Sequence, residues 1–154
     1  MPSAKDSIDT KKVIDTLNAI LETELAGVVR YTHYSLMIFG HARIPIVAWM
    51  RDQASEGMTH ATQAGELITA LGGHPSLKIG KLLETHRHDM DQILREAIEH
   101  EKEGVALYRK LLGLVKDRSV RIEEYARSMV ADEEAHLSEI EKMLRPPGKL
   151  QPAR

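Results

Sequence analysis

Apolar residues recur along this chain at the three- and four-residue spacing of amphipathic helices, and the pattern stops at glycine and proline. Pro45 opens one such segment, Gly72 closes it, Ser119 precedes another as a candidate N-cap, and Pro146 follows its end. Strand signals are nearly absent, so the pattern predicts an all-α chain. The predicted helices cover residues 9–39, 45–71, 82–115 and 119–144.

The connections between the predicted helices differ in length. Short turns join the first helix to the second and the third to the fourth, whereas a stretch of about ten residues with little helical phase follows Pro75. Four long helices with one longer connection match a four-helix bundle with a single crossover. With 154 residues and 42% hydrophobic content, we expect one domain over residues 1–154 with short tails.

Charged residues occupy positions in these stripes where apolar residues are expected. Glu133 and His136 fall within the apolar repeat of the last helix, three residues apart on one face. Glu24 interrupts the first stripe and His60 the second, with Glu56 one turn before His60. Burying such groups costs on the order of several kcal/mol unless they are paired. A metal ion held by carboxylates and imidazoles is the partner that this pattern favours, and a buried ion-pair network that fixes helix register is the alternative.

The third helix carries several polar residues close to its apolar stripe. His100 falls within the stripe, and Glu96 and Glu103 flank it, so this helix can also supply an inward ligand. We interpret His100 as a core histidine with satisfied hydrogen bonds, and the acidic run Glu99, Glu101 and Glu103 as a mostly solvated face. Five other histidines show no paired spacing with carboxylates and receive no role: His33, His41, His74, His86 and His88.

Composition and charge narrow the classes of function. The chain has 21 basic and 23 acidic residues, a net charge of −2 without a basic field for nucleic acid or an acidic membrane. It has no cysteine, so any metal must use carboxylates and imidazoles. No apolar run approaches the roughly 20 residues that span a bilayer, and residues 1–12 lack the apolar core of a signal peptide. The expectation is a soluble cytoplasmic protein.

Four segments resemble the ligand-bearing segments of the ferritin-like superfamily, and within it the bacterioferritins, over essentially the whole chain. These segments are residues 17–25, 58–61, 94–98 and 132–136. The resemblance implies a ferritin-like four-helix bundle that holds two iron ions, with Glu133 bridging them. Five of the six expected ligands are implied in this way: Glu24, His60, Glu96, Glu133 and His136.

The sixth ligand departs from the family pattern. The family has Glu-x-x-His on the second helix, but the residue three before His60 is Gly57. Glu56, four before His60, lies on nearly the same face and is the candidate substitute. If Glu56 does not reach the site, the resemblance implies one iron, a looser pair, or another metal such as zinc or manganese.

Two further residues match family positions. Met58 aligns with the methionine that binds haem between two subunits, so haem b is a candidate second cofactor, and helix packing is the alternative for this side chain. Tyr31 corresponds to a tyrosine beside the di-iron centre, placed to form a hydrogen bond or to donate an electron, with ordinary core packing as its alternative.

The function implied by the resemblance is that of a bacterioferritin-like ferroxidase. It would oxidise Fe(II) with oxygen or peroxide and store or detoxify the iron in a homo-oligomeric shell. A DNA-protecting mini-ferritin is an alternative. Its support is thin and consists of the basic residues Lys5, Lys11 and Lys12 and the tail of residues 149–154. In that class, the iron ligands would lie between subunits. A ferritin-like assembly protein with an altered metal site rests on Gly57 alone. For a di-iron oxidase of organic substrates, nothing in the sequence marks a substrate pocket.

Overall fold

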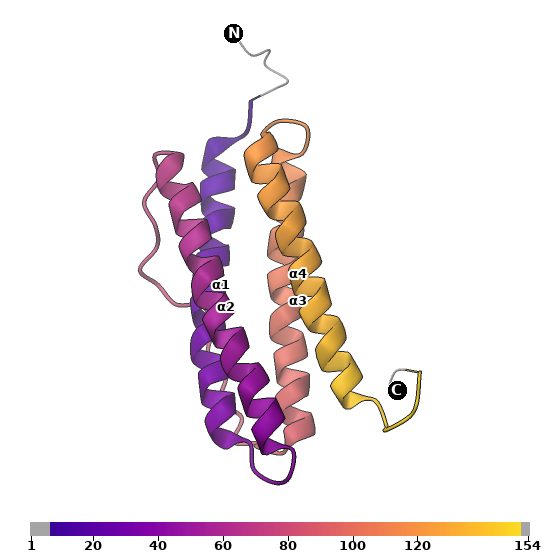
Figure 1. The fold of residues 1–154 in the computed structure, drawn as a ribbon. Helices are drawn as coiled ribbons and strands as arrows, with labels where there is room; N and C mark the ends of the chain where they lie inside the picture. The colour runs from indigo at the N-terminus through magenta and orange to yellow at the C-terminus, as the bar shows by residue number, and fades with distance from the viewer. Residues whose placement is uncertain (1–6, 152–154) are drawn as a thin grey trace.

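The computed structural model describes residues 7–151, which form a bundle of four long helices (Figure 1). The first helix pairs with the second and the third with the fourth, and the first also packs against the third. The predicted all-α class and the four-helix bundle with one long crossover are therefore confirmed. The helices are α1 (Thr10–Met37), α2 (Arg43–Ala70), α3 (Met90–Val115) and α4 (Val120–Leu144).

Local capping chemistry explains the starts of α1 and α3. The Asp9 carboxylate accepts a hydrogen bond from a backbone N–H in the first turn of α1, and Asp89 does the same for α3. Ser119 is the N-cap residue of α4, as the sequence predicts, but its side chain makes no capping hydrogen bond with the described residues. Instead, the Glu123 carboxylate accepts the backbone N–H of Asp117 at that end.

The third helix begins at Met90, later than the predicted start at residue 82. The reason lies in the segment just before it. The Glu84 carboxylate accepts the backbone N–H of His86, and His86 adopts a φ of +54°, which a right-handed helix does not allow. Asp89 then supplies the cap from which α3 starts.

The crossover between α2 and α3 runs between opposite ends of the bundle, where α2 finishes and α3 starts (Figure 1). It follows α1 on its way. The backbone N–H of Ser76 donates to Asn18 Oδ1 over 2.8 Å, and that of Gly80 donates to the carbonyl oxygen of Glu22, also over 2.8 Å. A Cβ at Gly80 would lie 2.9 Å from that carbonyl oxygen, so only glycine fits this close approach.

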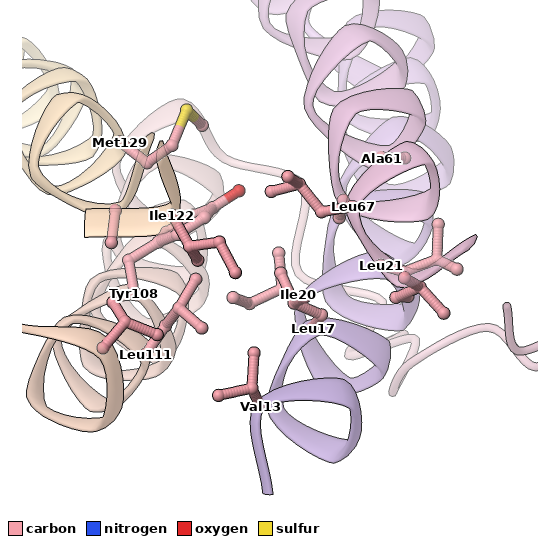
Figure 2. Close-up of a cluster of buried hydrophobic side chains, with 14 residues drawn as sticks. Val13, Leu17, Ile20, Leu21, Ala61, Leu67, Tyr108, Leu111, Ile122 and Met129 are labelled. Atoms are coloured by element: carbon pink, nitrogen blue, oxygen red, sulfur yellow. The ribbon is translucent and has the colours of Figure 1, made fainter. Parts of the chain in front are cut away.

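Two hydrophobic clusters fill the core, one toward each end of the bundle. Each large apolar side chain that becomes buried contributes about 1.5–3 kcal/mol to stability. The first cluster joins the N-terminal part of α1 to facing residues of the other helices (Figure 2), and includes Val13, Leu17, Ile20, Leu67, Tyr108, Leu111, Ile122 and Met129. The second cluster includes Tyr31, Tyr34, Ile38, Met50, Ile93, Leu94 and Ile140.

The basic residues near the N-terminus are largely paired with acids. Lys11 Nζ lies 2.6 Å from an Asp15 oxygen, and Lys12 Nζ lies 3.3 Å from an Asp9 oxygen. Lys5 and residues 152–154 lie outside the described residues. Over residues 7–151, no helix combines the length and the apolar character that a membrane span requires.

Candidate metal centre

A layer of polar side chains lies between the two hydrophobic clusters, at the middle of the bundle. On α1, Glu24 falls between Leu21 of the first cluster and Tyr31 of the second, and the other helices repeat this order. The layer is largely buried, with Glu133 only 5% exposed. We call it the central cluster, and it consists of Glu24, Glu56, His60, Glu101, Glu133 and His136.

His60 brings α1, α2 and α4 together at one side of the central cluster. Its Nδ1 lies 3.5 Å from Glu24 Oε1 and 3.2 Å from Glu133 Oε1. Ligand atoms of these three residues lie within 4.8 Å of one another, close enough to bind one ion.

His136 gathers a second group of ligand atoms beside the first. Its Nδ1 lies 3.7 Å from Glu133 Oε2, and its Nε2 lies 2.9 Å from Glu56 Oε2. Ligand atoms of His136, Glu133 and Glu101 also lie within 4.8 Å of one another. Glu133 therefore belongs to both groups, and its two oxygens face different histidines.

Two buried tyrosines hold carboxylates of the central cluster. The Tyr108 hydroxyl donates to Glu24 Oε1 over 2.6 Å, and the Tyr31 hydroxyl donates to Glu101 Oε1. Burial and the adjacent carboxylates raise the pKa of both hydroxyls. Both tyrosines therefore stay protonated and act as donors that orient the carboxylates.

Burial and mutual contact set the protonation of the central cluster when no metal is bound. Burial raises the pKa of Glu24, and burial together with Glu133 raises the pKa of Glu101 well above its usual value. Burial also disfavours ionised Glu133, but hydrogen bonds with His136, His60 and Glu101 outweigh it and lower the pKa of Glu133.

Hydrogen bonds, rather than burial, decide the direction in which the pKa of His60 shifts. Burial lowers its pKa, but hydrogen bonds to Glu133 and Glu24 outweigh burial and raise the pKa to about 10. Protons on His60 and Glu101 therefore offset part of the negative charge of this buried layer. A bound cation would take their place, because metal ligands bind in their deprotonated forms.

The carboxylate that α3 contributes to the central cluster differs from the one that the resemblance implies. The structure does not bring Glu96 into the central cluster, because the Glu96 carboxylate accepts hydrogen bonds from Thr85 over 2.5 Å and Gln92 over 3.3 Å. Glu101 lies there instead. Its interpretation as part of a solvated face is wrong, since Glu101 is only 5% exposed.

A signal for Glu101 exists in the sequence. Tyr108 is fully buried, and Glu101 lies seven residues before it and four after buried Ala97, which is the spacing of one helix face. The apolar stripe that contains His100 does not include Glu101.

Gly57 lies where α2 packs closely against α1. A Cβ at this position would meet Val28 Cγ2 at 3.2 Å and the backbone oxygen of Glu24 at 3.3 Å. The helices therefore leave little room for a side chain at the position where the family pattern has a glutamate. Glu56, whose side chain is about half exposed, reaches His136 from the edge of the central cluster instead.

The residues of the central cluster line a cavity that His100 also borders. Among the described residues, His100 belongs to neither ligand group. Its Nδ1 lies 3.2 Å from Arg30 Nη1, and Arg30 also donates to the Tyr34 hydroxyl. Burial and then the Arg30 charge lower the pKa of His100 to about 4, so the ring is neutral. A Cβ at Gly27 would lie 2.7 Å from His100 Nε2, so this glycine makes room for the ring.

Met58, by contrast, lies on the surface of α2 and is 49% exposed.

The donor set of the central cluster fits divalent iron or a similar first-row metal. Four carboxylates and two imidazoles converge from four helices, with one glutamate each on α1 and α3 and a glutamate–histidine pair each on α2 and α4. Four carboxylates would also neutralise two divalent ions when fully ionised. Hydrophobic clusters on both sides restrict access of water to the layer.

Comparisons with known proteins agree with this arrangement. The family described as "Ferritin-like domain" matches residues 14–146. A sequence search of curated proteins finds no match.

Solved structures match the chain over most of its length. A ferritin-like diiron-carboxylate protein from Bacillus anthracis is 25% identical with a TM-score of 0.82, covering 90% of this chain and 99% of that one. The bacterioferritin of Desulfovibrio desulfuricans, whose structure describes a diiron site, is 27% identical with a TM-score of 0.75, covering 87% and 78%. The bacterioferritin of Rhodobacter capsulatus is 25% identical with a TM-score of 0.73, covering 86% and 82%.

Proposed function

This chain belongs to the ferritin-like domain family, and from that premise we propose that it binds two Fe(II) ions in the central cluster and oxidises them with oxygen or peroxide. The observation that carries the proposal is the shared position of Glu133. One of its oxygens faces His60 with Glu24, the other faces His136, and Glu101 completes the second group. A carboxylate that belongs to both ligand groups can bridge two ions by binding one ion with each oxygen.

Each residue of the central cluster has a role in this proposal. Glu24 and His60 bind one ion, Glu101 and His136 bind the other, and Glu133 bridges them. The contacts among these residues support this division.

Glu56 is the proposed sixth ligand, replacing the carboxylate that Gly57 cannot supply. Its 2.9 Å contact with His136 supports this assignment, and its half-exposed side chain is accessible to ions in solvent. Tyr31 and Tyr108 are positioning residues that hold Glu101 and Glu24 through their hydroxyl groups.

The proposed reaction takes one electron from each of two Fe(II) ions. Dioxygen that accepts two electrons and two protons becomes hydrogen peroxide, and peroxide that accepts two electrons and two protons becomes two waters. Carboxylate oxygens favour the Fe(III) product because they are hard, anionic ligands. Protons that His60 and Glu101 hold in the metal-free state leave when iron binds, so uptake of iron releases acid.

Stoichiometry and oxidation rate test the proposal. The metal-free protein would be titrated anaerobically with Fe(II), and oxygen or peroxide would then be admitted while ferric absorbance is followed. We expect two irons per chain, oxidised together and much faster than in buffer. One iron or none, with oxidation no faster than in buffer, would refute the proposal.

A matched pair of variants on α4 makes this test specific. Glu133→Gln removes the bridging charge, whereas Glu134→Gln changes the neighbouring residue, which is exposed and pairs with Arg109. Glu133→Gln should abolish rapid oxidation, and Glu134→Gln should leave it within about twofold of the parent. Equal behaviour of the two variants would remove the central cluster from the reaction.

We further propose that the protein stores or detoxifies iron in a homo-oligomeric shell. Large apolar side chains on the bundle surface support an assembly, since Phe39 is 73%, Ile44 84% and Val120 79% exposed. Light scattering after size exclusion should give a closed, high-order assembly that retains added iron. A monomer would contradict the shell while leaving the di-iron site untouched.

The mini-ferritin alternative is less well supported, because the ligands of the central cluster come from one bundle rather than from two subunits. Haem b at Met58 stays a separate proposal. It requires two copies of this surface methionine to face each other, and Met58→Leu should then abolish any haem absorbance band without harming the fold.

A further inference from the structure

A second group of side chains that could hold a metal ion lies outside the central cluster, where the crossover meets α1. Glu84 and His88 come from the end of the crossover, and His33 comes from α1. His33 Nε2 lies 3.0 Å from Glu84 Oε2, and His88 Nε2 lies 3.5 Å from Glu84 Oε1. Ligand atoms of all three residues lie within 4.8 Å of one another. The group shares no residue with the central cluster.

The path of the crossover fixes this meeting point. Hydrogen bonds from Ser76 to Asn18 and from Gly80 to Glu22 tie the chain to successive turns of α1 before it reaches Glu84. His33 lies further along the same helix. The carboxylate of Glu84 therefore arrives beside His33 through contacts that do not involve either residue.

The local turn brings His88 to the same carboxylate. His86 adopts a left-handed conformation with φ of +54°, and its backbone N–H donates to Glu84 Oε1. This conformation costs a non-glycine residue on the order of 1 kcal/mol and persists only where the surroundings favour it. It folds the segment so that both Glu84 and His88 face His33.

His88 itself carries an unmet hydrogen-bonding requirement. Its Nε2 atom is buried and has no hydrogen-bond partner among the described residues. Buried polar atoms are usually paired, and an unpaired one calls for an explanation such as an ion. The atom faces the Glu84 carboxylate, from which it is 3.5 Å away.

We propose that His33, Glu84 and His88 bind a divalent transition-metal ion of the Zn²⁺ class. Two imidazoles and one carboxylate suit such ions and do not suit Mg²⁺ or Ca²⁺, which prefer oxygen ligands. Tetrahedral ligands about 2.0–2.1 Å from zinc lie roughly 3.3 Å apart. The two separations between Glu84 oxygens and the histidines, 3.0 Å and 3.5 Å, are close to that value, and ligand atoms of the two histidines lie within 4.8 Å of each other.

The remaining coordination positions of this outer site are open. Glu84 is exposed, and His33 and His88 are partly exposed. A hollow beside them, lined by Val29, Tyr34, Leu82 and Leu83 among others, leaves space for water on the ion. Bound metal would tie the crossover to α1.

Counting bound zinc tests the outer site independently of iron oxidation. Full-length, chelator-treated protein would be dialysed against Zn²⁺, and the metal per chain would be measured for the parent and for His33→Gln, Glu84→Gln and His88→Gln. Each variant should bind one Zn²⁺ per chain fewer than the parent. His41→Gln, which changes an exposed histidine outside the site, should bind as many as the parent.

A second readout locates the metal. Zn²⁺ should protect His33 and His88 from carbethoxylation in the parent protein, and this protection should be lost in Glu84→Gln. Unchanged zinc counts in the variants, or equal modification of the two histidines with and without zinc, would overturn the proposal. Loss of zinc in Glu84→Gln alone would also overturn it, because the imidazoles would then not be ligands. None of these results bears on the central cluster, whose iron oxidation is measured separately.

Discussion

Replacing Glu101 tests the role of the central cluster most sharply, because metal-free stability and iron chemistry should respond in different ways. An ionised Glu101 would lie at most 4.8 Å from an ionised Glu133 oxygen. At an effective dielectric constant of about 20, two like charges at that distance repel by about 3.5 kcal/mol. Burial is the larger cause: together with this repulsion it raises the pKa of Glu101, which holds a proton when no metal is bound.

Glu101→Gln therefore replaces a neutral group with a neutral group of nearly the same shape. The amide oxygen can accept the Tyr31 hydroxyl, and the amide nitrogen can donate to Glu133. We expect the free energy of unfolding of the metal-free protein, measured with urea, to change by less than about 1 kcal/mol. Iron oxidation should slow by at least about 100-fold, because residues that only support metal ligands already cost about 10–100-fold.

Glu96→Gln is the matched control on the same helix. Glu96 bonds Thr85 and Gln92 rather than the central cluster, so oxidation should stay within about tenfold of the parent. Anaerobic Fe(II) titration and stopped-flow absorbance would be applied to both variants. Slow oxidation in Glu96→Gln together with normal oxidation in Glu101→Gln would refute this reasoning and favour the ligand that the sequence resemblance implies.

Three further predictions concern stability. The pKa of His60 is about 10 in the folded protein and 6.5 in the unfolded chain, so its contribution to stability is complete below pH 6.5 and is lost toward pH 10. The urea midpoint of metal-free protein should therefore fall as the pH rises over that range. His60→Gln should make this fall smaller. Gly65→Ala should raise stability by up to about 1 kcal/mol in thermal unfolding, whereas Gly27→Ala should gain less or lose stability because its Cβ meets His100; equal gains would contradict the close approach. Gly80→Ala should destabilise the protein by about 1–3 kcal/mol and speed limited proteolysis of the crossover, and an unaffected digestion rate would argue against its tight fit on α1.

The sequence predicts the bundle because helix periodicity and its breaks are local signals. Pro45, Gly72 and Pro146 mark boundaries close to the observed ones. The start of α3 is not predictable in this way, because residues 82–89 contain helix-compatible side chains and only the contacts of the Glu84 carboxylate reveal the left-handed turn at His86. A tertiary contact decides that boundary.

Local signals in the sequence reveal some residues of the candidate site, and tertiary packing decides the others. Glu24, His60, Glu133 and His136 interrupt apolar stripes and are found together, since a charged residue inside a regular stripe is visible in one helix alone. Choosing between Glu96 and Glu101 requires the rotation of α3 about its axis. That rotation is set by packing against its neighbours, including the buried Tyr108.

Spacing alone could reveal only part of the outer site, because Glu84 and His88 are four residues apart but His33 comes from α1. His33 lies far from His88 in sequence, and only the path of the crossover along α1 brings them to one carboxylate. Residues on a connection carry no periodic pattern that would reveal which face of a helix they meet.

The two helical hairpins, α1 with α2 and α3 with α4, divide the central cluster equally. The first supplies Glu24, Glu56 and His60, and the second supplies Glu101, Glu133 and His136, so each hairpin carries two carboxylates and one imidazole. The molecule is thus a tandem of two half-sites joined by the crossover. Cutting the chain within the crossover would give two fragments with the same types of ligand. Under the proposed function, a metal ion bound by both fragments would favour their association. Two copies of one such hairpin would offer the same set of ligand types as the whole bundle.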